Sequence, residues 1–440
     1  MLELPNAILI RPFPSDLAVN ARISVPGSKS LTNRSLILAA LENGKTKLQG
    51  ALWAEDTELM VHALRKLGFT IDVSPDTSNP FNRFLDVTGC GGNIPVPQAD
   101  LDVGTAGTVA RFLTAFCALG EGPYKLHGTP RMHERPMEEI FEAVRSLGGK
   151  VQDTNGHLPA TIWGKIRPGK VSVSDEDSSQ FASALVLLKK VLKIEVDCPN
   201  PLSPYVDMTY QLLKEWGKPS STRQIEADAS SAAYFFALER IHSNAGTGGR
   251  MNISRWSPKS SQLDRLIDDD QKIWTPLWNS HLQDSVFEVS RKTDLGDAAM
   301  ILVIAAAVCW RRRFHLKEAA NMRKQECDRI SALAIELRKC GVPVQELPDG
   351  LILEHTTQFK KATIHTYNDH RMAMSFAILG TVDVMGDGKP WITIENPSCV
   401  RKTFPNFFET LEEVARQSYK SAGVSHVPIV LKIDGKPLFD

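Results

Sequence analysis

The sequence predicts a repeated α/β fold made of two similar lobes. Six apolar stretches with helical character recur roughly every fifty to seventy-five residues, and each follows small, hydroxyl or charged residues. Segments typical of β-strands lie between them and usually end at Gly, Pro or Asn. The chain has 440 residues, which is too long for one ordinary hydrophobic core. We therefore expect six helix-plus-strand units, grouped as two sets of three.

The expected elements follow the chain in order. The six apolar helices are expected at 30–41, 107–119, 178–188, 230–238, 297–308 and 371–379. Strands are most evident at 170–173, 192–196 and 391–394. Two more helices, at 138–147 and 328–340, place charged residues between Ile, Leu and Val at a helical period. This pattern indicates one solvent-facing side, so we expect them to be the second, more exposed helices of their units.

Three segments do not fit the repeat. Residues 219–223 form a short polar stretch, and residues 241–285 mix Gly-Thr-Gly-Gly, three consecutive Asp and three Trp without clear periodicity. After Ser421 the chain carries apolar runs on either side of Asp434-Gly435. Because Asp-Gly between apolar runs favours a two-residue turn, we expect a hairpin at the C-terminal end.

Composition and charge exclude several classes of protein. The 51 basic and 51 acidic residues give a formal net charge of zero, so no overall charge favours nucleic acid or an anionic membrane as partner. The most apolar run, 298–310, is too short to span a bilayer, and the first residues lack the pattern of a secretion signal. Seven cysteines without a Cys-x-x-Cys pair favour a reducing compartment, so we expect a cytoplasmic protein. The histidines show no metal-ligand spacing, and neither a metal nor another cofactor is expected.

A helix start near residue 30 is the first candidate for binding anions. A strand-like segment is broken by Pro26-Gly27, and hydroxyl and basic side chains follow at Ser28, Lys29, Ser30 and Arg34. Unpaired backbone N–H groups and the positive end of the helix dipole face outward at such a start. The alternative is that Ser28 or Ser30 only caps the helix and that Lys29 is solvated.

Other helix starts and loops also carry cationic or amide groups. They include Arg111, Arg131, Arg135, Gln180, Arg329, His370, Arg371 and Lys402. Each one alone is more typical of a surface charge, but their recurrence at one position of the repeat favours a site for a substrate with several negative charges. Two acids, Asp297 and Glu326, are candidates for a general acid or base. The alternative for Asp297 is a helix N-cap.

Eight motifs keep their order from about residue 20 to about residue 415 and together carry a resemblance. They are Pro26-Gly27-Ser28-Lys29-Ser30 with Asn33-Arg34, Ala106-Gly107-Thr108 with Arg111-Phe112-Leu113, Arg131-Met132 with Glu134-Arg135-Pro136, Ser178-Ser179-Gln180-Phe181, Asp228-Ala229-Ser230-Ser231-Ala232, Asp328-Arg329, Asn368-Asp369-His370-Arg371-Met372-Ala373-Met374 and Lys402-Thr403-Phe404-Pro405. In this order they resemble the EPSP synthase family of 3-phosphoshikimate 1-carboxyvinyltransferases, which are enolpyruvyl transferases.

The resemblance implies a more specific fold. Each lobe would consist of three βαβαββ repeats, an inside-out α/β barrel, and the chain would cross between the lobes near Asn20 and near Asp228. The implied domains are a first lobe of 1–20 and 228–420, a second lobe of 21–227, and a C-terminal extension of 421–440. The active site would lie in the cleft between the lobes, which close on the substrates.

The resemblance also implies the reaction. The enolpyruvyl group of phosphoenolpyruvate would be transferred to the 5-hydroxyl of shikimate 3-phosphate by addition and elimination, with release of phosphate and without a metal. Two substrates that carry two phosphates and two carboxylates need many cations in a dry site. A monomer that acts on these small molecules, within aromatic amino acid biosynthesis, is expected.

Matching motifs imply the residues of the site. Those expected to hold shikimate 3-phosphate are Lys29, Ser30, Arg34, Ser178, Ser179, Gln180, Tyr205, Asp297, Asn321 and Gln325. Those expected to hold phosphoenolpyruvate are Lys29, Thr105, Gly107, Arg131, Gln180, Arg329, His370, Arg371 and Lys402. Asp297 would take the hydroxyl proton, while Lys29 and Glu326 would move a proton to and from the methylene carbon.

Departures from the family pattern leave alternatives open. Gln325 stands where the family usually has a lysine, Lys324 lies one residue earlier, and Thr105 replaces the more frequent Asn. A lost charged hydrogen bond costs roughly 1.5–3 kcal/mol, or about ten- to a hundred-and-fifty-fold in rate. One alternative is a divergent paralogue that uses another hydroxylated acceptor in a specialised pathway, and another is a non-catalytic homologue that binds anions. An enolpyruvyl transferase for UDP-N-acetylglucosamine fits less well, because residues 128–136 contain no cysteine.

Overall fold

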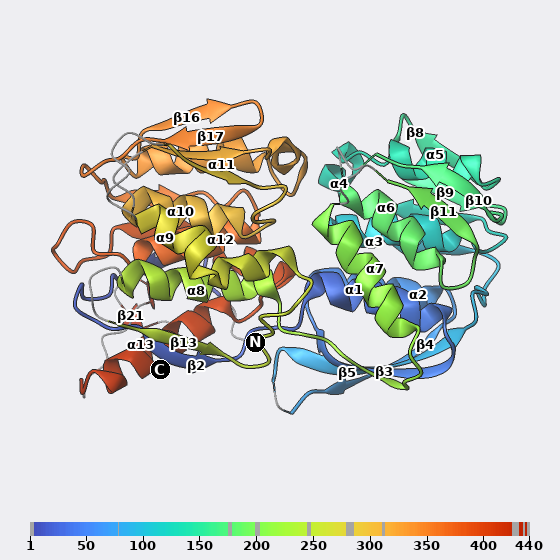
Figure 1. The fold of residues 1–440 in the computed structure, drawn as a ribbon, viewed down its shortest axis with the longest axis horizontal. Helices are drawn as coiled ribbons and strands as arrows, with labels where there is room; N and C mark the ends of the chain where they lie inside the picture. The colour runs from blue at the N-terminus through green and yellow to red at the C-terminus, as the bar shows by residue number, and fades with distance from the viewer. Residues whose placement is uncertain are drawn as a thin grey trace. The chain divides into compact units, whose positions relative to one another are not determined.

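The chain forms two compact units in the computed structural model (Figure 1). The structure describes residues 4–77, 79–174, 178–198, 203–243, 248–278, 286–309, 313–424, 431–433 and 436–437. Unit 1 comprises Met1–Val25 and Ala227–Asp440, and unit 2 comprises Pro26–Glu226. The first crossing falls after Val25, later than expected, because strand β2 (Asn20–Ile23) pairs in parallel with β13 (Arg250–Ile253) of unit 1.

Unit 2 combines helices with mixed sheets. Its helices are α1 (Lys29–Leu41), α2 (Glu55–Lys66), α3 (Gly107–Cys117), α4 (Pro130–Glu134), α5 (Glu138–Ser146), α6 (Ser179–Leu188) and α7 (Pro204–Trp216). One sheet has the order β12 (Thr222–Gln224), β3 (Asn43–Leu52), β5 (Asn82–Cys90), β4 (Thr70–Pro75). A second has the order β6 (Ala99–Asp102), β7 (Tyr124–His127), β9 (His157–Trp163), β8 (Lys150–Thr154). A third pairs β10 (Gly169–Ser172) with β11 (Ile194–Asp197).

Unit 1 has the same kinds of element. Its helices are α8 (Ala229–Ser243), α9 (Thr275–Trp278), α10 (Ala299–Cys309), α11 (Arg329–Lys339), α12 (His370–Gly380) and α13 (Phe407–Ser421). Short helical turns lie at Leu263–Asp268, Asp270–Trp274, Ala320–Lys324 and Pro397–Lys402. One sheet has the order β14 (Phe287–Ser290), β15 (Phe314–Lys317), β17 (Gly350–Leu353), β16 (Val344–Leu347). Another has the order β18 (Ala362–Ile364), β19 (Ile392–Glu395), β1 (Ala7–Ile10), β20 (Leu431–Ile433), β21 (Lys436–Pro437).

One strand pattern recurs and confirms the predicted repeat. In unit 2 the parallel pair β6 and β7 brackets α3, and the antiparallel hairpin of β8 and β9 follows α5. In unit 1 the parallel pair β14 and β15 brackets α10, and the hairpin of β16 and β17 follows α11. Both segments read βαβαββ along the chain, because a parallel pair needs a crossover connection whereas a hairpin does not.

The apolar helices pack against one another within each unit. In unit 2, α1, α3 and α6 are in contact, and in unit 1, α8, α10 and α12 are in contact. Every residue of α3 and of α12 is buried. A helix that is apolar on all sides must be covered on all sides. The six predicted helices are confirmed, although α8 continues beyond the predicted end to Ser243.

The C-terminal strands extend a sheet of unit 1. Strand β20 pairs antiparallel with β1, and β20 and β21 pair antiparallel with each other. The two strands of the predicted hairpin are therefore confirmed. Its Asp434-Gly435 turn lies outside the described residues.

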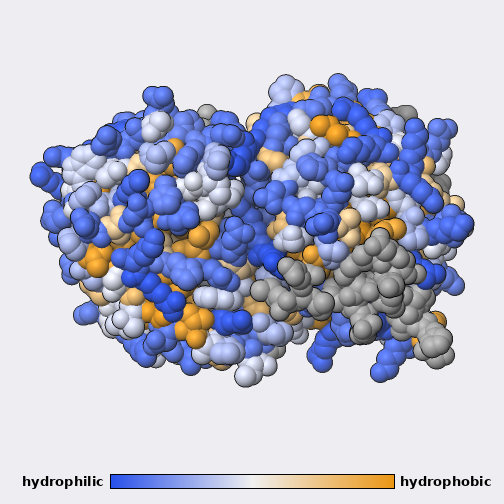
Figure 2. Space-filling model, turned by 180° about the vertical axis from the view of Figure 1, so that it is seen from behind, coloured by the Kyte–Doolittle hydropathy of each residue, from blue (hydrophilic) through white to orange (hydrophobic). Residues whose placement is uncertain are grey.

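The surface is mainly polar. Figure 2 shows hydrophilic residues over most of the face that it draws, with apolar residues in small groups. Within the described ranges, the large apolar side chains that are exposed are Val191, Val286, Ile335 and Val424. None of the helices described is both long and apolar enough to cross a membrane.

A buried histidine on α8 predicts that acid destabilises unit 1. The rings of His242 and Phe13 have centroids 5.1 Å apart, and His242 Nε2 lies 3.1 Å from Thr381 Oγ1. Burial lowers the pKa of His242 from 6.5 to about 4. The unfolded chain therefore binds this proton before the folded chain does. The contribution of neutral His242 to the free energy of unfolding is fully present above about pH 6.5 and is lost as the pH falls to about 4. The change is roughly 3 kcal/mol.

Urea unfolding at a series of pH values from 7 to 4 measures this effect. The His242→Gln variant lacks the titrating group, so its free energy of unfolding is expected to fall less steeply with acid than that of the wild type. Equal slopes in the two proteins would contradict the prediction.

Candidate active site

The starts of the three central helices of unit 1 lie together. Arg371, on the first turn of α12, places Nη2 2.8 Å from Oδ2 of Asp297, which comes just before α10. Its Nη1 donates to the hydroxyl of Tyr234 on α8 at 3.5 Å. The repeat therefore brings charged side chains from segments far apart in the sequence into one cluster.

The carboxylate of Asp297 is held by three guanidinium groups. Its Oδ1 lies 3.2 Å from Arg291 Nη2 and 3.5 Å from Arg329 Nη1, and its Oδ2 contacts Arg371. The Asp297 side chain is 23% exposed, so a substrate can reach it. A helix N-cap needs none of these contacts. The arrangement suits a carboxylate that is fixed in position and accepts a proton.

Arg329 opens α11 and is almost completely buried, at 2% exposure. Its Nε and Nη2 donate to the carboxylate of Asp369 at 2.7 and 3.2 Å. Its Nη2 contacts Glu326 at 2.9 Å, and its Nη1 donates to Gln325 Oε1 at 2.5 Å. Burial disfavours the charged form, but the nearby carboxylates outweigh burial and hold the pKa of Arg329 above its usual value. The guanidinium group is therefore permanently positive.

Glu326 joins Arg329 to a second cation. Its Oε1 lies 3.5 Å from Lys402 Nζ, and the two side chains are 11% and 7% exposed. Gln325 directs its amide oxygen to Arg329. The structure thus brings together the predicted residues Asp297, Glu326, Arg329, Arg371 and Lys402, and their binding of an anionic substrate stays a prediction.

Asp264 belongs to this cluster although the sequence assigned it no role. Its buried carboxylate accepts hydrogen bonds from the Ser230 hydroxyl on α8 and from the backbone N–H of Ala298 at 3.2 Å. Burial, followed by the charge of Asp297, raises the pKa of Asp264. The sequence of residues 241–285 has no clear periodicity, so it did not indicate this place for Asp264.

Two further predicted residues of unit 1 lie beside the cluster. His370 is completely buried, and its Nδ1 is 3.6 Å from Asp369 Oδ1. Asn321 lies in the turn Ala320–Lys324. Their contacts with a substrate stay predictions, and the burial of His370 favours a packing role for it.

The starts of four helices also lie together in unit 2. Arg34, on α1, donates from Nε to Thr209 of α7 at 2.8 Å and from Nη2 to Ser183 of α6 at 3.2 Å. Its Cζ lies 5.1 Å from the ring centroid of Phe112 on α3. Burial lowers the pKa of Arg34 to about 10. These contacts join the helices, and the expected contact of Arg34 with shikimate 3-phosphate stays a prediction.

Two guanidinium groups lie against the start of α3. Arg111 Nη1 donates to Gln180 Oε1 of α6 at 2.8 Å, and Arg135 Nη1 donates to the carbonyl oxygen of Thr105 at 3.0 Å. A Cβ atom at Gly107 would lie only 2.6 Å from Arg135 Nη2 and 2.9 Å from Arg111 Nη1. Glycine at this position is therefore what allows both cations to lie beside the helix start.

The other predicted cations of unit 2 are more accessible. Lys29 Nζ lies 3.1 Å from Asp56 Oδ2, and its side chain is 16% exposed. Arg131 Nη1 lies 2.7 Å from Glu134 Oε2, and its side chain is 34% exposed. Each cation keeps a carboxylate partner together with access to solvent.

The predicted hydroxyl ligands of unit 2 lie at helix starts. Ser28 is buried and accepts from the backbone N–H of Leu31 at 3.4 Å, so it caps α1. Ser178 caps α6 by accepting from the N–H of Gln180 at 3.2 Å. The first turns of α1, α6 and α7 carry Ser30, Ser179 and Tyr205.

A repeated α/β fold with cations and carboxylates gathered at helix starts suits an enzyme whose substrates carry several negative charges. The family model of EPSP synthase (3-phosphoshikimate 1-carboxyvinyltransferase) matches residues 15–411. The chain therefore belongs to the EPSP synthase family.

Relatives and solved structures agree with this assignment. The chain is 35% identical over 447 residues to the 3-phosphoshikimate 1-carboxyvinyltransferase of Opitutus terrae, covering 95% of this chain and 99% of the relative. It is 35% identical over 426 residues to the enzyme of the same name from Trichormus variabilis, covering 89% and 95%. The structure of EPSP synthase from Acinetobacter baumannii matches the fold with a TM-score of 0.70 at 22% identity, covering 94% of this chain and 98% of that chain.

Proposed function

We propose that this enzyme transfers the enolpyruvyl group of phosphoenolpyruvate to the 5-hydroxyl of shikimate 3-phosphate and releases phosphate. The hydroxyl oxygen adds to C2 of phosphoenolpyruvate while C3 gains a proton. The bond to phosphate then breaks while the new methyl group loses a proton, which restores the double bond. The family and the relatives named above support this reaction. The observation that carries the proposal is the Asp297 carboxylate, held by three guanidinium groups and still accessible.

The unit 1 cluster suits the chemical steps. Asp297 takes the hydroxyl proton, because it is the accessible carboxylate at the centre of the cluster. Arg329 and Arg371 supply permanent positive charge for the phosphate and carboxylate of phosphoenolpyruvate, and the ammonium group of Lys402 lies beside Glu326 in the same cluster. Glu326 contacts both Arg329 and Lys402, so it is the candidate of unit 1 for moving the proton at C3.

The unit 2 cluster suits substrate binding. We assign Lys29, Gln180, Arg131 and the backbone N–H groups at the start of α3 to the anionic groups of the substrates. Lys29 is also a candidate for moving the proton at C3. Ser30, Ser178, Ser179 and Tyr205, at the starts of α1, α6 and α7, are assigned to shikimate 3-phosphate.

A phosphate-release assay with purified protein tests the reaction. Phosphate is expected to appear only when phosphoenolpyruvate and shikimate 3-phosphate are both present, together with a product that carries the added carboxyvinyl group. No release with shikimate 3-phosphate, combined with release on a different hydroxylated acceptor, would overturn the proposal. Binding of both substrates without any turnover would favour a non-catalytic protein instead.

Replacing Gly107 by alanine is expected to lower the phosphate-release rate by roughly a hundredfold, because a shift of about 1 Å at a positioned group has effects of this size. The added methyl group would lie within 3.0 Å of nitrogen atoms of Arg135 and Arg111, which must move. Gly169→Ala is the matched control, since the nearest atom to its Cβ is a flexible leucine methyl at 3.2 Å. Equal rates for the two variants would contradict the prediction.

A further inference from the structure

Unit 2 contains a polar hollow that the proposed reaction does not use. Its volume is about 370 Å³, and it is lined by Glu42, Asn43, Lys45, Thr46, Lys190, residues 216–221 and Arg223. The lining includes most of the polar stretch 219–223, which the repeat did not explain. The hollow lies at the C-terminal ends of α1, α6 and α7.

The hollow is separate from the unit 2 cluster described above. The candidate ligands Lys29, Ser179 and Tyr205 lie at the first turns of α1, α6 and α7. Helix α1 has 13 residues, which at 1.5 Å per residue separates its two ends by about 20 Å. A ligand in the hollow therefore does not touch that cluster.

Positive charge dominates the lining of the hollow. Four cations line it, Lys45, Lys190, Lys218 and Arg223, against one acid, Glu42. Lys190 Nζ is paired with Glu42 Oε1 at 2.8 Å, which neutralises that pair. The remaining three cations leave the hollow with a local excess of positive charge.

The guanidinium group of Arg223 is held in place by backbone carbonyl oxygens. Its guanidinium group donates to the carbonyl oxygens of Glu215 at 3.1 Å and Lys218 at 2.7 Å. Its Cζ lies 4.8 Å from the ring centroid of Trp216, so the guanidinium covers this buried indole. The hollow therefore presents charge and hydrogen-bonding groups rather than an aromatic surface.

Cations at helix C-termini often serve only to satisfy the last carbonyl groups. Lys190 and Arg223 already fill this role at α7, since each donates to the carbonyl oxygen of Trp216, at 3.3 and 3.5 Å. Lys45 and Lys218 are exposed, and within the described residues their ammonium groups make no ion pair or hydrogen bond. A structural role does not account for these two charges.

We propose that this hollow is a binding site for a small anion with two or more negative charges, a compound that carries phosphate or carboxylate groups. Lys45 and Lys218 bind the ligand through their ammonium groups, and Arg223 adds a positive charge that backbone carbonyl oxygens hold in place. Recognition by charge and hydrogen bonds suits such an anion and does not suit an apolar or aromatic ligand.

Hydrogen exchange with inorganic pyrophosphate and with citrate as probes tests the site, because exchange is read segment by segment. At a probe concentration ten times the dissociation constant, exchange is expected to slow by about tenfold in residues 42–46 and 216–223. Protection by pyrophosphate alone identifies phosphate compounds as the ligand class, and protection by both probes identifies multivalent anions in general. No protection in these segments with either probe would overturn the proposal.

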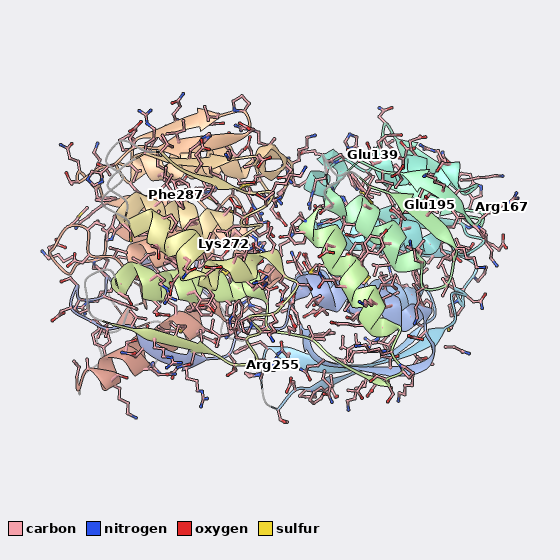
Figure 3. All side chains as sticks on the ribbon, viewed as in Figure 1. Glu139, Arg167, Glu195, Arg255, Lys272 and Phe287 are labelled. Atoms are coloured by element: carbon pink, nitrogen blue, oxygen red, sulfur yellow. The ribbon has the colours of Figure 1, made fainter. Side chains whose placement is uncertain are left out.

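The Lys45→Ala/Lys218→Ala variant tests the residues. It is expected to weaken the affinity for the probe by about tenfold, since the loss of contacts from two exposed charges has effects of this size. The matched control is Lys150→Ala/Arg167→Ala, which removes the same charge from unit 2 outside the hollow; Figure 3 labels Arg167 at the outer edge of this unit. Undiminished protection in the Lys45/Lys218 variant would overturn the assignment. The phosphate-release rate is expected to stay unchanged in both variants, so this outcome is independent of the proposed reaction.

Discussion

Replacing Asp297 by asparagine is expected to lower the turnover number by about 100- to 10,000-fold. Asparagine keeps the shape of the side chain, but its amide cannot take up the proton of the attacking hydroxyl group. The three guanidinium groups around this position remain. The KM for phosphoenolpyruvate is therefore expected to change far less than the turnover number.

Asp294 provides a matched control on the same loop. Its Oδ2 accepts from the backbone N–H of Ser290 at 2.9 Å, and within the described residues it contacts no guanidinium group. Asp294→Asn is expected to keep the wild-type rate. Steady-state phosphate release gives the turnover number, and calorimetry gives the affinity for shikimate 3-phosphate. A loss that Asp297→Asn shows only in this affinity, with turnover unchanged, would remove Asp297 as the proton acceptor.

The central helices could be predicted because they are apolar on every side. Runs such as 107–119 and 371–379 must be buried, and the glycine, hydroxyl and basic residues just before them mark their starts. Because the repeats within a unit are alike, the helix starts of that unit lie together. The contact of Arg371 with Asp297 shows this in unit 1, and that of Arg111 with Gln180 shows it in unit 2. The charged and amide residues at the helix starts could therefore be predicted from local patterns.

The partners inside each cluster could not be predicted, because they depend on residues far apart in the chain. No pattern in the sequence indicated that the guanidinium group of Arg34 joins α1 to α6 and α7. Arg291 and Asp264 lie in segments without periodicity. Both come close to Asp297 only because the turn Leu263–Asp268 and the loop after β14 pack beside it.

Replacing Arg329 by methionine is expected to lower the free energy of unfolding of unit 1 by about 3–5 kcal/mol. Arg329 and its partner Asp369 are 2% and 0% exposed. Methionine fills part of the volume but carries no charge. The carboxylates of Asp369 and Glu326 would stay buried without this guanidinium group, and an uncompensated buried charge is far more costly than a lost surface pair.

Two further variants test whether the expected destabilisation by Arg329→Met comes from a buried charge without a partner or only from lost contacts. Arg313→Met removes a guanidinium that is 54% exposed and lies 2.8 Å from Glu354, so its expected cost is below about 1 kcal/mol. Arg329→Met/Asp369→Asn removes the stranded carboxylate, while asparagine keeps an oxygen for the N–H of Arg371. This double variant is expected to regain part of the lost stability. Hydrogen exchange of α11 and α12 in urea measures all three, and a double variant less stable than Arg329→Met would show that the buried charge is not the cause.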